Sequence, residues 1–133
     1  INYMHENVSL PTNLKIGENN ILLDNVSINP KTVLGNGNII WSNSVISHNV
    51  KMKNFNWVSS GSVVSGETTV GSCNFFGSNS TVSNNSSIGD NSFIGAGTLV
   101  SGKIGNNSTF INSKSKSLRI KSNEFLKYIK NER

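Results

Sequence analysis

The sequence predicts an all-β protein, a left-handed parallel β-helix of six-residue repeats, and two observations support this fold class. The first is that every sixth residue from Met4 to Val100 is apolar, which makes a run of seventeen positions. Because only 35% of the chain is hydrophobic, chance would give such a run roughly once in ten million trials. The second is that outward positions spaced eighteen residues apart share a character, so three repeats make one coil.

Each repeat predicts one short strand followed by one turn. The apolar residue and the residue two positions before it, such as Val64 and Ser62, face the interior. Inward positions two residues apart are typical of a strand. Gly, Asn and Ser fill the positions between strands, and these residues favour turns, including turns with positive φ. We therefore expect a prism of stacked triangular coils.

One outer face of this prism is apolar along its whole length. We call it the apolar ridge, and its residues, eighteen apart, are Tyr3, Ile21, Ile39, Trp57, Phe75 and Phe93. The two other faces mix polar and apolar residues at the equivalent positions. A continuous exposed apolar strip is typical of an interaction surface. We expect the ridge to mediate self-association, with Trp41 and Trp57 packed in the interface. A ridge covered by the tail or by a further domain is the alternative.

The repeat ends near Phe110. Its six-residue step shortens to four between Val100 and Ile104, and the repeat then continues only to Phe110. We expect a β-helix domain over residues 1–112 and a basic C-terminal tail over residues 113–133. In the tail, Phe125, Leu126 and Ile129 have helical spacing, which predicts a short helix that caps the open end of the prism.

Charge and composition narrow the class of function. The net charge of +5 lies wholly in the tail, because the acidic and basic residues before position 111 balance. A neutral body disfavours nucleic-acid binding. No apolar run is long enough to span a membrane, and the single Cys73 cannot form an internal disulfide, so we expect a cytoplasmic protein with no membrane partner. With only two histidines, we expect no metal site.

His48 is the candidate for chemistry. It lies two residues after the inward Ile46, at a corner where side chains project outward. Eighteen residues later the same corner carries Gly66, which leaves space and a backbone N–H beside the imidazole. A base next to an amide donor suits acyl transfer, because one removes a proton and the other stabilises an oxyanion. From the residues alone, an ordinary surface histidine remains an alternative.

Several segments resemble a known family. The runs Ser47-His48-Asn49-Val50, Gly61-Ser62-Val63-Val64-Ser65-Gly66, Val70-Gly71 and Ile94-Gly95-Ala96-Gly97 are similar to the core of hexapeptide-repeat sugar acetyltransferases. The closest group is the nucleotide-aminosugar N-acetyltransferases with the related sialic acid O-acetyltransferases. The likeness spans about Met4 to Phe110. His5-Glu6-Asn7-Val8 also resembles the His-Pro-x-Ala start of their β-helix, which follows a small Rossmann-like sugar-nucleotide domain.

The resemblance implies a function and its site. It implies that residues 1–112 are an acyltransferase domain that transfers an acetyl group from acetyl-CoA to an amino or hydroxyl group of a nucleotide-linked sugar, in bacterial surface-polysaccharide biosynthesis. It implies a homotrimer with acetyl-CoA between adjacent prisms. The implied catalytic residues are His48 as general base, Asn49 as its orienting partner and Gly66 as oxyanion donor. The implied acetyl-CoA contacts are Gly66, Asn84, Ala96, Gly97, Gly102 and Lys103.

Two features depart from the family pattern. The family usually has Asp or Glu directly after the histidine, where this chain has Asn49. The Gly-x-Pro-Ala ending of the family is replaced by the basic tail. A non-catalytic β-helical trimerisation scaffold is therefore the alternative function, and acetyl-CoA binding separates it from an enzyme.

Overall fold

The computed structural model describes residues 1–131, without the side chains of Ile129 and Asn131. It contains eighteen two-residue strands and one helix, α1 (Ser122–Asn131). The strands are β1 (Tyr3–Met4), β2 (Lys15–Ile16), β3 (Ile21–Leu22), β4 (Ser27–Ile28), β5 (Val33–Leu34), β6 (Ile39–Ile40), β7 (Val45–Ile46), β8 (Lys51–Met52), β9 (Trp57–Val58), β10 (Val63–Val64), β11 (Thr69–Val70), β12 (Phe75–Phe76), β13 (Thr81–Val82), β14 (Ser87–Ile88), β15 (Phe93–Ile94), β16 (Leu99–Val100), β17 (Lys103–Ile104) and β18 (Thr109–Phe110).

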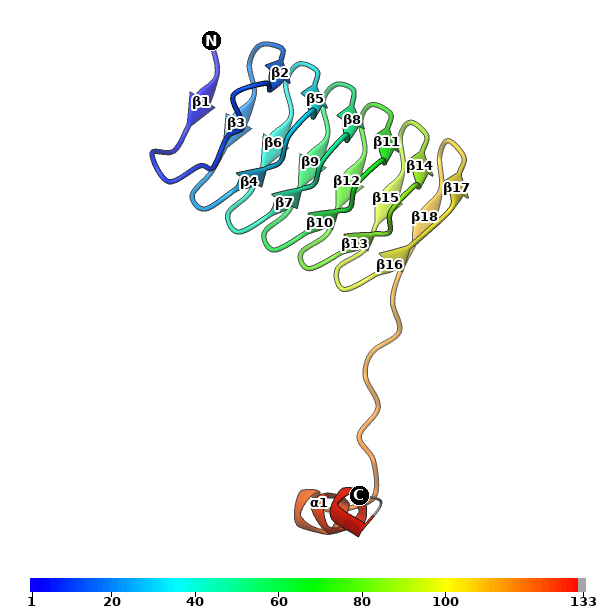
Figure 1. The fold of residues 1–133 in the computed structure, drawn as a ribbon. Coiled ribbons are helices and arrows are strands. Elements are labelled where there is room, and N and C mark those ends of the chain that lie inside the picture. The colour runs from blue at the N-terminus through cyan, green and yellow to red at the C-terminus, as the bar shows by residue number, and fades with distance from the viewer. Residues whose placement is uncertain (132–133) are drawn as a thin grey trace.

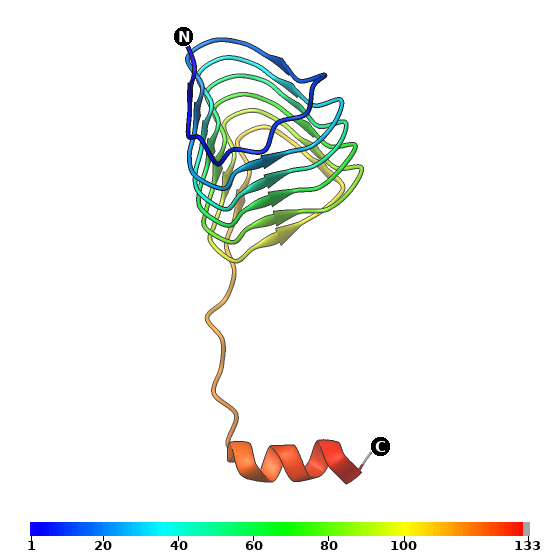
Figure 2. The same ribbon diagram turned by 60° about the vertical axis from the view of Figure 1, so that its left-hand side comes forward.

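The strands form three parallel sheets that wrap around one axis, which confirms the predicted left-handed parallel β-helix. Sheet A has the order β1-β3-β6-β9-β12-β15-β18, sheet B has β16-β13-β10-β7-β4, and sheet C has β17-β14-β11-β8-β5-β2. Figure 1 shows the three ladders along the stack, and Figure 2 shows the triangular coils nearly end on. In sheet B, Val64 pairs with Ile46 on one side and with Val82 on the other, as the eighteen-residue period predicts.

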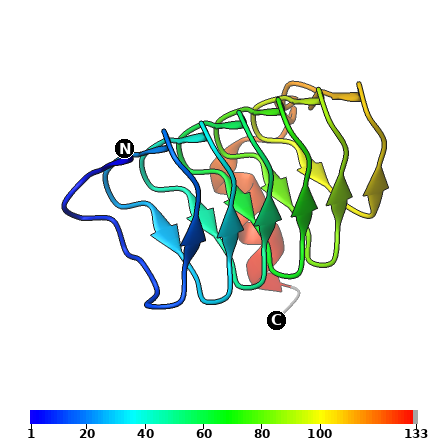
Figure 3. The same ribbon diagram turned by 90° about the horizontal axis from the view of Figure 1, so that it is seen from above.

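The interior is a single apolar column along the axis of the stack. Its fully buried side chains include Leu22, Ile40, Ile46, Val58, Val64 and Ile94, which all lie on the predicted six-residue register. Seen from above, the coils lie side by side with regular spacing (Figure 3). Each inner side chain therefore packs on the equivalent residue of the coils before and after it, so every coil depends on its neighbours.

Sheet A also buries a ladder of asparagines, which the sequence pattern did not reveal. Asn20, Asn38, Asn56 and Asn74 are at most 2% exposed. The Asn56 side-chain amide donates to the Gly71 carbonyl and to the Asn38 side-chain oxygen, at 2.9 and 3.0 Å. The Asn56 oxygen accepts from the backbone and side-chain nitrogens of Asn74, both at 3.0 Å. The ladder thus satisfies its own polar groups inside the prism.

The corners contain most of the residues with unusual backbone conformation. Most non-glycine residues with positive φ are asparagines, for example Asn49 at 56° and Asn85 at 57°. Asparagine tolerates this left-handed region better than most residues, which explains the Asn-rich composition. Corner side chains also contact along the stack: the Ser42 hydroxyl donates a hydrogen bond to the Asp24 carboxylate and thereby lowers the pKa of Asp24.

The predicted apolar ridge lies on the outer face of sheet A. Its aromatic rings stack from coil to coil, with ring centroids 6.5 Å apart for Trp57 and Phe75 and 5.1 Å apart for Phe75 and Phe93. Trp41 joins the row at 5.6 Å from Trp57. Trp57, Phe75 and Phe93 are each more than a third exposed. In the single chain the ridge is therefore an exposed, ordered aromatic strip.

The last strands of the prism lie where the repeat predicts them, whereas the C-terminal helix lies away from the end of the prism. The shortened step after Val100 still leaves β17 in register with β14, and β18 pairs with β15. The predicted helix exists as α1, but residues 111–121 extend away from the last coil and α1 lies clear of the prism (Figures 1 and 2). Phe125 and Leu126 are exposed, and the Ile129 side chain lies outside the described residues. This single chain therefore does not show the expected cap.

Among the described residues, no helix has the length and apolar character needed to cross a membrane.

Candidate functional site

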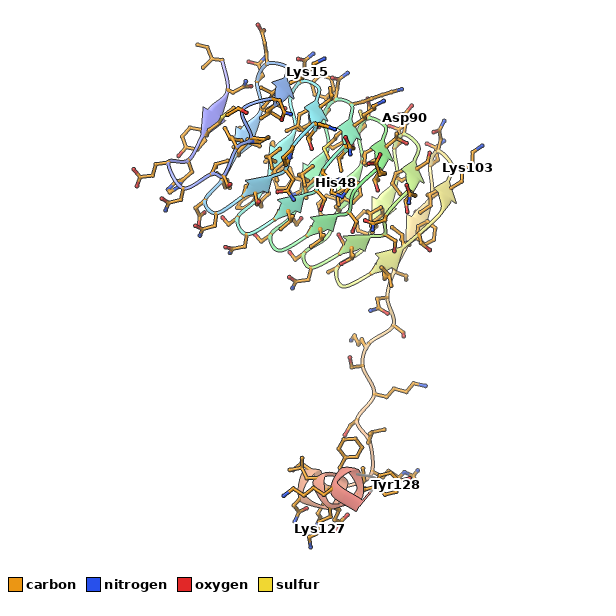
Figure 4. The ribbon with its side chains drawn as sticks, in the orientation of Figure 1. Lys15, His48, Asp90, Lys103, Lys127 and Tyr128 are labelled. Atoms are coloured by element: carbon orange, nitrogen blue, oxygen red, sulfur yellow. The ribbon has the colours of Figure 1, made fainter. Side chains whose placement is uncertain are left out.

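His48 and Gly66 occupy the same corner of the prism in consecutive coils. His48 follows β7 and Gly66 follows β10, at the corner between sheets B and C. Figure 4 shows His48 near the middle of the stack. The imidazole is 58% exposed, whereas Gly66 is buried. The sequence-based placement of the two residues side by side is therefore correct.

The imidazole covers the position where Gly66 lacks a side chain. A Cβ on Gly66 would lie 2.5 Å from His48 Nε2 and 2.6 Å from His48 Cε1, well inside van der Waals contact. Any residue larger than glycine would thus push the ring away. In the part of the chain that the structure describes, the Gly66 N–H has no backbone acceptor, while its neighbour Glu67 donates to the His48 carbonyl at 3.1 Å. An imidazole and an uncommitted amide are thus adjacent.

A third polar group, Glu67, joins this corner, and the sequence reasoning missed it. Glu67 Oε1 lies 3.7 Å from His48 Nδ1 and accepts a hydrogen bond from the Asn49 amide at 2.5 Å. The Asn49 amide nitrogen is in turn 3.2 Å from His48 Nδ1. Glu67 follows Asn49 by eighteen residues, so reading the corner column one position after His48 would have found it. His48, Asn49 and Glu67 thus form one polar cluster across two coils.

The candidate acetyl-CoA contacts divide between two corners. Asn84 and Gly102 follow β13 and β16, so they continue the corner of His48 and Gly66 along the stack, and Lys103 begins the next strand, β17. Ala96 and Gly97 instead follow β15, at the corner between sheets A and B. A single chain therefore does not bring all six residues together.

Other candidates lie away from this corner. His5 follows β1 at the corner between sheets A and B, and its Nδ1 accepts a hydrogen bond from the Asn7 backbone at 3.2 Å. Two shallow grooves, of about 250 and 360 Å³, lie over sheet C, and neither is lined by His48 or Gly66. Within residues 1–131, no cluster of three or more His, Cys, Asp or Glu residues is placed to hold a metal ion.

The chain matches one protein-family model and several solved structures. The model described as bacterial transferase hexapeptide (six repeats) matches residues 13–48 and 67–102, more than half of the chain. A search of curated proteins finds no match to the sequence. The other similarities of the chain are therefore to solved structures.

Three of these structures are acyltransferases with bound ligands. The acetyltransferase domain of PglB from Neisseria gonorrhoeae, in complex with acetyl coenzyme A, has a TM-score of 0.81 at 20% identity over 88% of this chain and 57% of that chain. A mutant of perosamine N-acetyltransferase from Caulobacter crescentus, with CoA and GDP-perosamine, scores 0.82 at 22% identity over 84% of this chain and 53% of that chain. A mutant of the N-acyltransferase AntD from Bacillus cereus, with dTDP and coenzyme A, scores 0.73 at 15% identity over 97% and 85%.

These structural likenesses concern the fold. The chain spans little more than half the length of the PglB and perosamine N-acetyltransferase chains it matches. At this level of identity the shared feature is the β-helix itself, on which the corner cluster of His48, Asn49, Gly66 and Glu67 is placed.

Proposed function

Because the chain belongs to the bacterial transferase hexapeptide family, we propose that it is the acyltransferase part of an enzyme that acetylates a nucleotide-linked sugar with acetyl-CoA. The observation that carries this proposal is the His48 imidazole lying over Gly66 at an open corner of the prism. The acceptor is an amino or hydroxyl group of the sugar. Consistent with this proposal, the three similar structures hold acetyl coenzyme A or coenzyme A, and two of them also hold a nucleotide or nucleotide sugar.

The chemistry at His48 is general base catalysis of acyl transfer. With an amine acceptor, the amine nitrogen attacks the thioester carbonyl carbon of acetyl-CoA, so that the C–N bond forms and the carbonyl oxygen takes the negative charge. The C–S bond then breaks as the carbonyl re-forms. His48 Nε2 takes the proton that the amine loses and returns it to the departing sulfur. The Gly66 N–H donates to the carbonyl oxygen while that oxygen carries negative charge. Asn49 helps to hold the ring in place through its hydrogen bond to the Glu67 carboxylate, which lies beside Nδ1.

We propose that acetyl-CoA binds between two chains of a homotrimer. Asn84, Gly102 and Lys103 extend the His48 corner, whereas Ala96 and Gly97 lie at another corner, so a neighbouring chain is needed to combine them. The grooves found on the single chain also exclude His48. A reaction that uses acetyl-CoA and a nucleotide sugar fits the cytoplasm and bacterial surface-polysaccharide biosynthesis.

The apolar ridge is the proposed contact between chains. Burying Trp57 and Phe75 contributes roughly 2 kcal/mol or more for each ring. We expect Trp57→Asp combined with Phe75→Asp to lower the mass in light scattering to that of a monomer. The matched control is Lys51→Asp with Thr69→Asp, at the equivalent outward positions of sheet C. An unchanged mass in the ridge variant would exclude the ridge as the interface.

Acetyl-CoA binding and transfer test the proposed function directly. We expect calorimetry to give a dissociation constant of about micromolar order for acetyl-CoA. Thiol release should then be measured with a panel of GDP-, UDP- and dTDP-linked amino sugars that includes GDP-perosamine, and with sialic acid as a hydroxyl acceptor. A chain that binds no acetyl-CoA is instead the non-catalytic trimerisation scaffold.

A further inference from the structure

The corner of His48 contains a carboxylate in an unexpected place. The family that the sequence resembles usually has Asp or Glu directly after the histidine, and this chain has the neutral Asn49 there. The structure places a carboxylate one coil further on, where Glu67 stacks on Asn49. The negative charge that Asn49 lacks is therefore present on Glu67 in the next coil.

The contacts of Glu67 connect it to the imidazole. Its Oε1 is 3.7 Å from His48 Nδ1, a distance for an ion pair rather than a hydrogen bond. The same oxygen accepts from the Asn49 amide at 2.5 Å. This amide lies between the ring and the carboxylate, so it holds the carboxylate oxygen on the Nδ1 side of His48.

The tautomer of His48 decides whether the ring can act as a base. Nε2 faces Gly66, so base catalysis there requires the single proton of neutral imidazole to be on Nδ1. A proton on Nδ1 is stabilised by a nearby acceptor or negative charge. The polar contacts of Nδ1 among the described residues are the Asn49 amide nitrogen, which is a donor, and Glu67 Oε1, which is an acceptor. Glu67 Oε1 is therefore the negative group that can stabilise a proton on Nδ1, by electrostatic attraction over 3.7 Å rather than by a hydrogen bond.

The backbone at Glu67 has the left-handed conformation that recurs at the corners of the prism. Glu67 has φ of 59°, in the left-handed region. Asparagine occupies the equivalent corner positions in the coils on either side, at Asn49 and Asn85, and it fits this conformation at lower cost. Lys31, Phe55 and Cys73 also have positive φ at corners, so this conformation belongs to the corner, and the role of Glu67 rests on its contacts with His48 and Asn49.

We propose that Glu67 is the positioning residue of His48. It selects the tautomer with the proton on Nδ1 and stabilises the imidazolium that forms when Nε2 accepts the acceptor's proton. Glu67 itself keeps its charge throughout. This inference rests on the proposed function, because it assigns a partner to the proposed general base.

The tautomer can be measured without any turnover. The chain has only two histidines, so the ¹⁵N signals of His48 and His5 can be resolved by NMR on the full chain. At a pH where both rings are neutral, we expect His48 of the wild type to carry its proton on Nδ1. In Glu67→Gln, His48 should change toward the Nε2-protonated form that a free histidine side chain prefers, while His5 stays unchanged. An Nδ1-protonated His48 in Glu67→Gln would overturn the proposal.

Kinetics provide the second readout. With the best acceptor from the transfer assay, we expect Glu67→Gln to lower kcat about 10–100-fold with little change in KM for acetyl-CoA. Adding Asn49→Asp to Glu67→Gln should recover activity, since it returns a carboxylate to the family's usual position.

A matched control separates this role from a general effect of charge. Glu18→Gln removes the same charge at an exposed corner of another coil and should leave both the kinetics and the His48 tautomer unchanged. Equal kcat in Glu67→Gln and wild type would overturn the proposal. If the wild type transfers no acetyl group, the proposed function fails, and the NMR result still decides whether Glu67 sets the tautomer.

Discussion

Substituting His48 by alanine is expected to lower kcat by about 10²–10⁴-fold, the usual contribution of a general base. The fold and acetyl-CoA affinity should change little, because the His48 side chain is 58% exposed and belongs to no part of the buried core. The measurement is thiol release from acetyl-CoA at saturating acceptor, in the protein as the cell makes it. Circular dichroism of the variant should match the wild type.

His5→Ala is the matched control for this experiment. It removes the other imidazole of the chain, which lies in the first coil at a different corner. We expect its kcat to equal that of the wild type. Full activity in His48→Ala would eliminate the general-base assignment and leave transfer assisted by the substrate, or the scaffold function.

The fold could be predicted from the sequence because each coil repeats the same inward positions. The register of Val64 with Ile46 and Val82 follows from an eighteen-residue period alone. The pairing of His48 with Gly66 follows for the same reason, since a regular solenoid converts sequence spacing directly into stacking. The helix at the C-terminus was also predicted, but its position was not. No repeat relates the tail to the prism, so the period gives no information on where α1 lies.

Two features were missed because their chemistry is absent from a hydrophobic pattern. Asn56 occupies an inward position that elsewhere holds small or β-branched residues, and its burial depends on hydrogen bonds to Asn38, Asn74 and Gly71. Glu67 was missed because a carboxylate was expected directly after His48. The equivalent corner residue of the next coil was not considered. Both features are visible only when polar residues are compared eighteen positions apart.

The asparagine ladder is expected to be as important for stability as the apolar column. Asn56→Leu has a similar volume, yet it removes the acceptor of the Asn74 backbone N–H and the donor to the Gly71 carbonyl. Leaving two buried polar groups without partners costs about 1–3 kcal/mol for each group. We therefore expect Asn56→Leu to lower the free energy of unfolding by about 2–6 kcal/mol.

The control for the ladder is Asn36→Leu, which makes the same substitution at an exposed corner. The Asn36 side chain accepts one hydrogen bond, from the Glu18 backbone at 2.8 Å. Water replaces this partner when it is lost, so the cost should be about 1 kcal/mol or less. Urea unfolding followed by circular dichroism, at one fixed protein concentration, compares the two variants. Equal midpoints would mean that the buried asparagines are tolerated rather than required. A much lower midpoint for Asn56→Leu would show that the coils are held together by amide hydrogen bonds as well as by apolar packing.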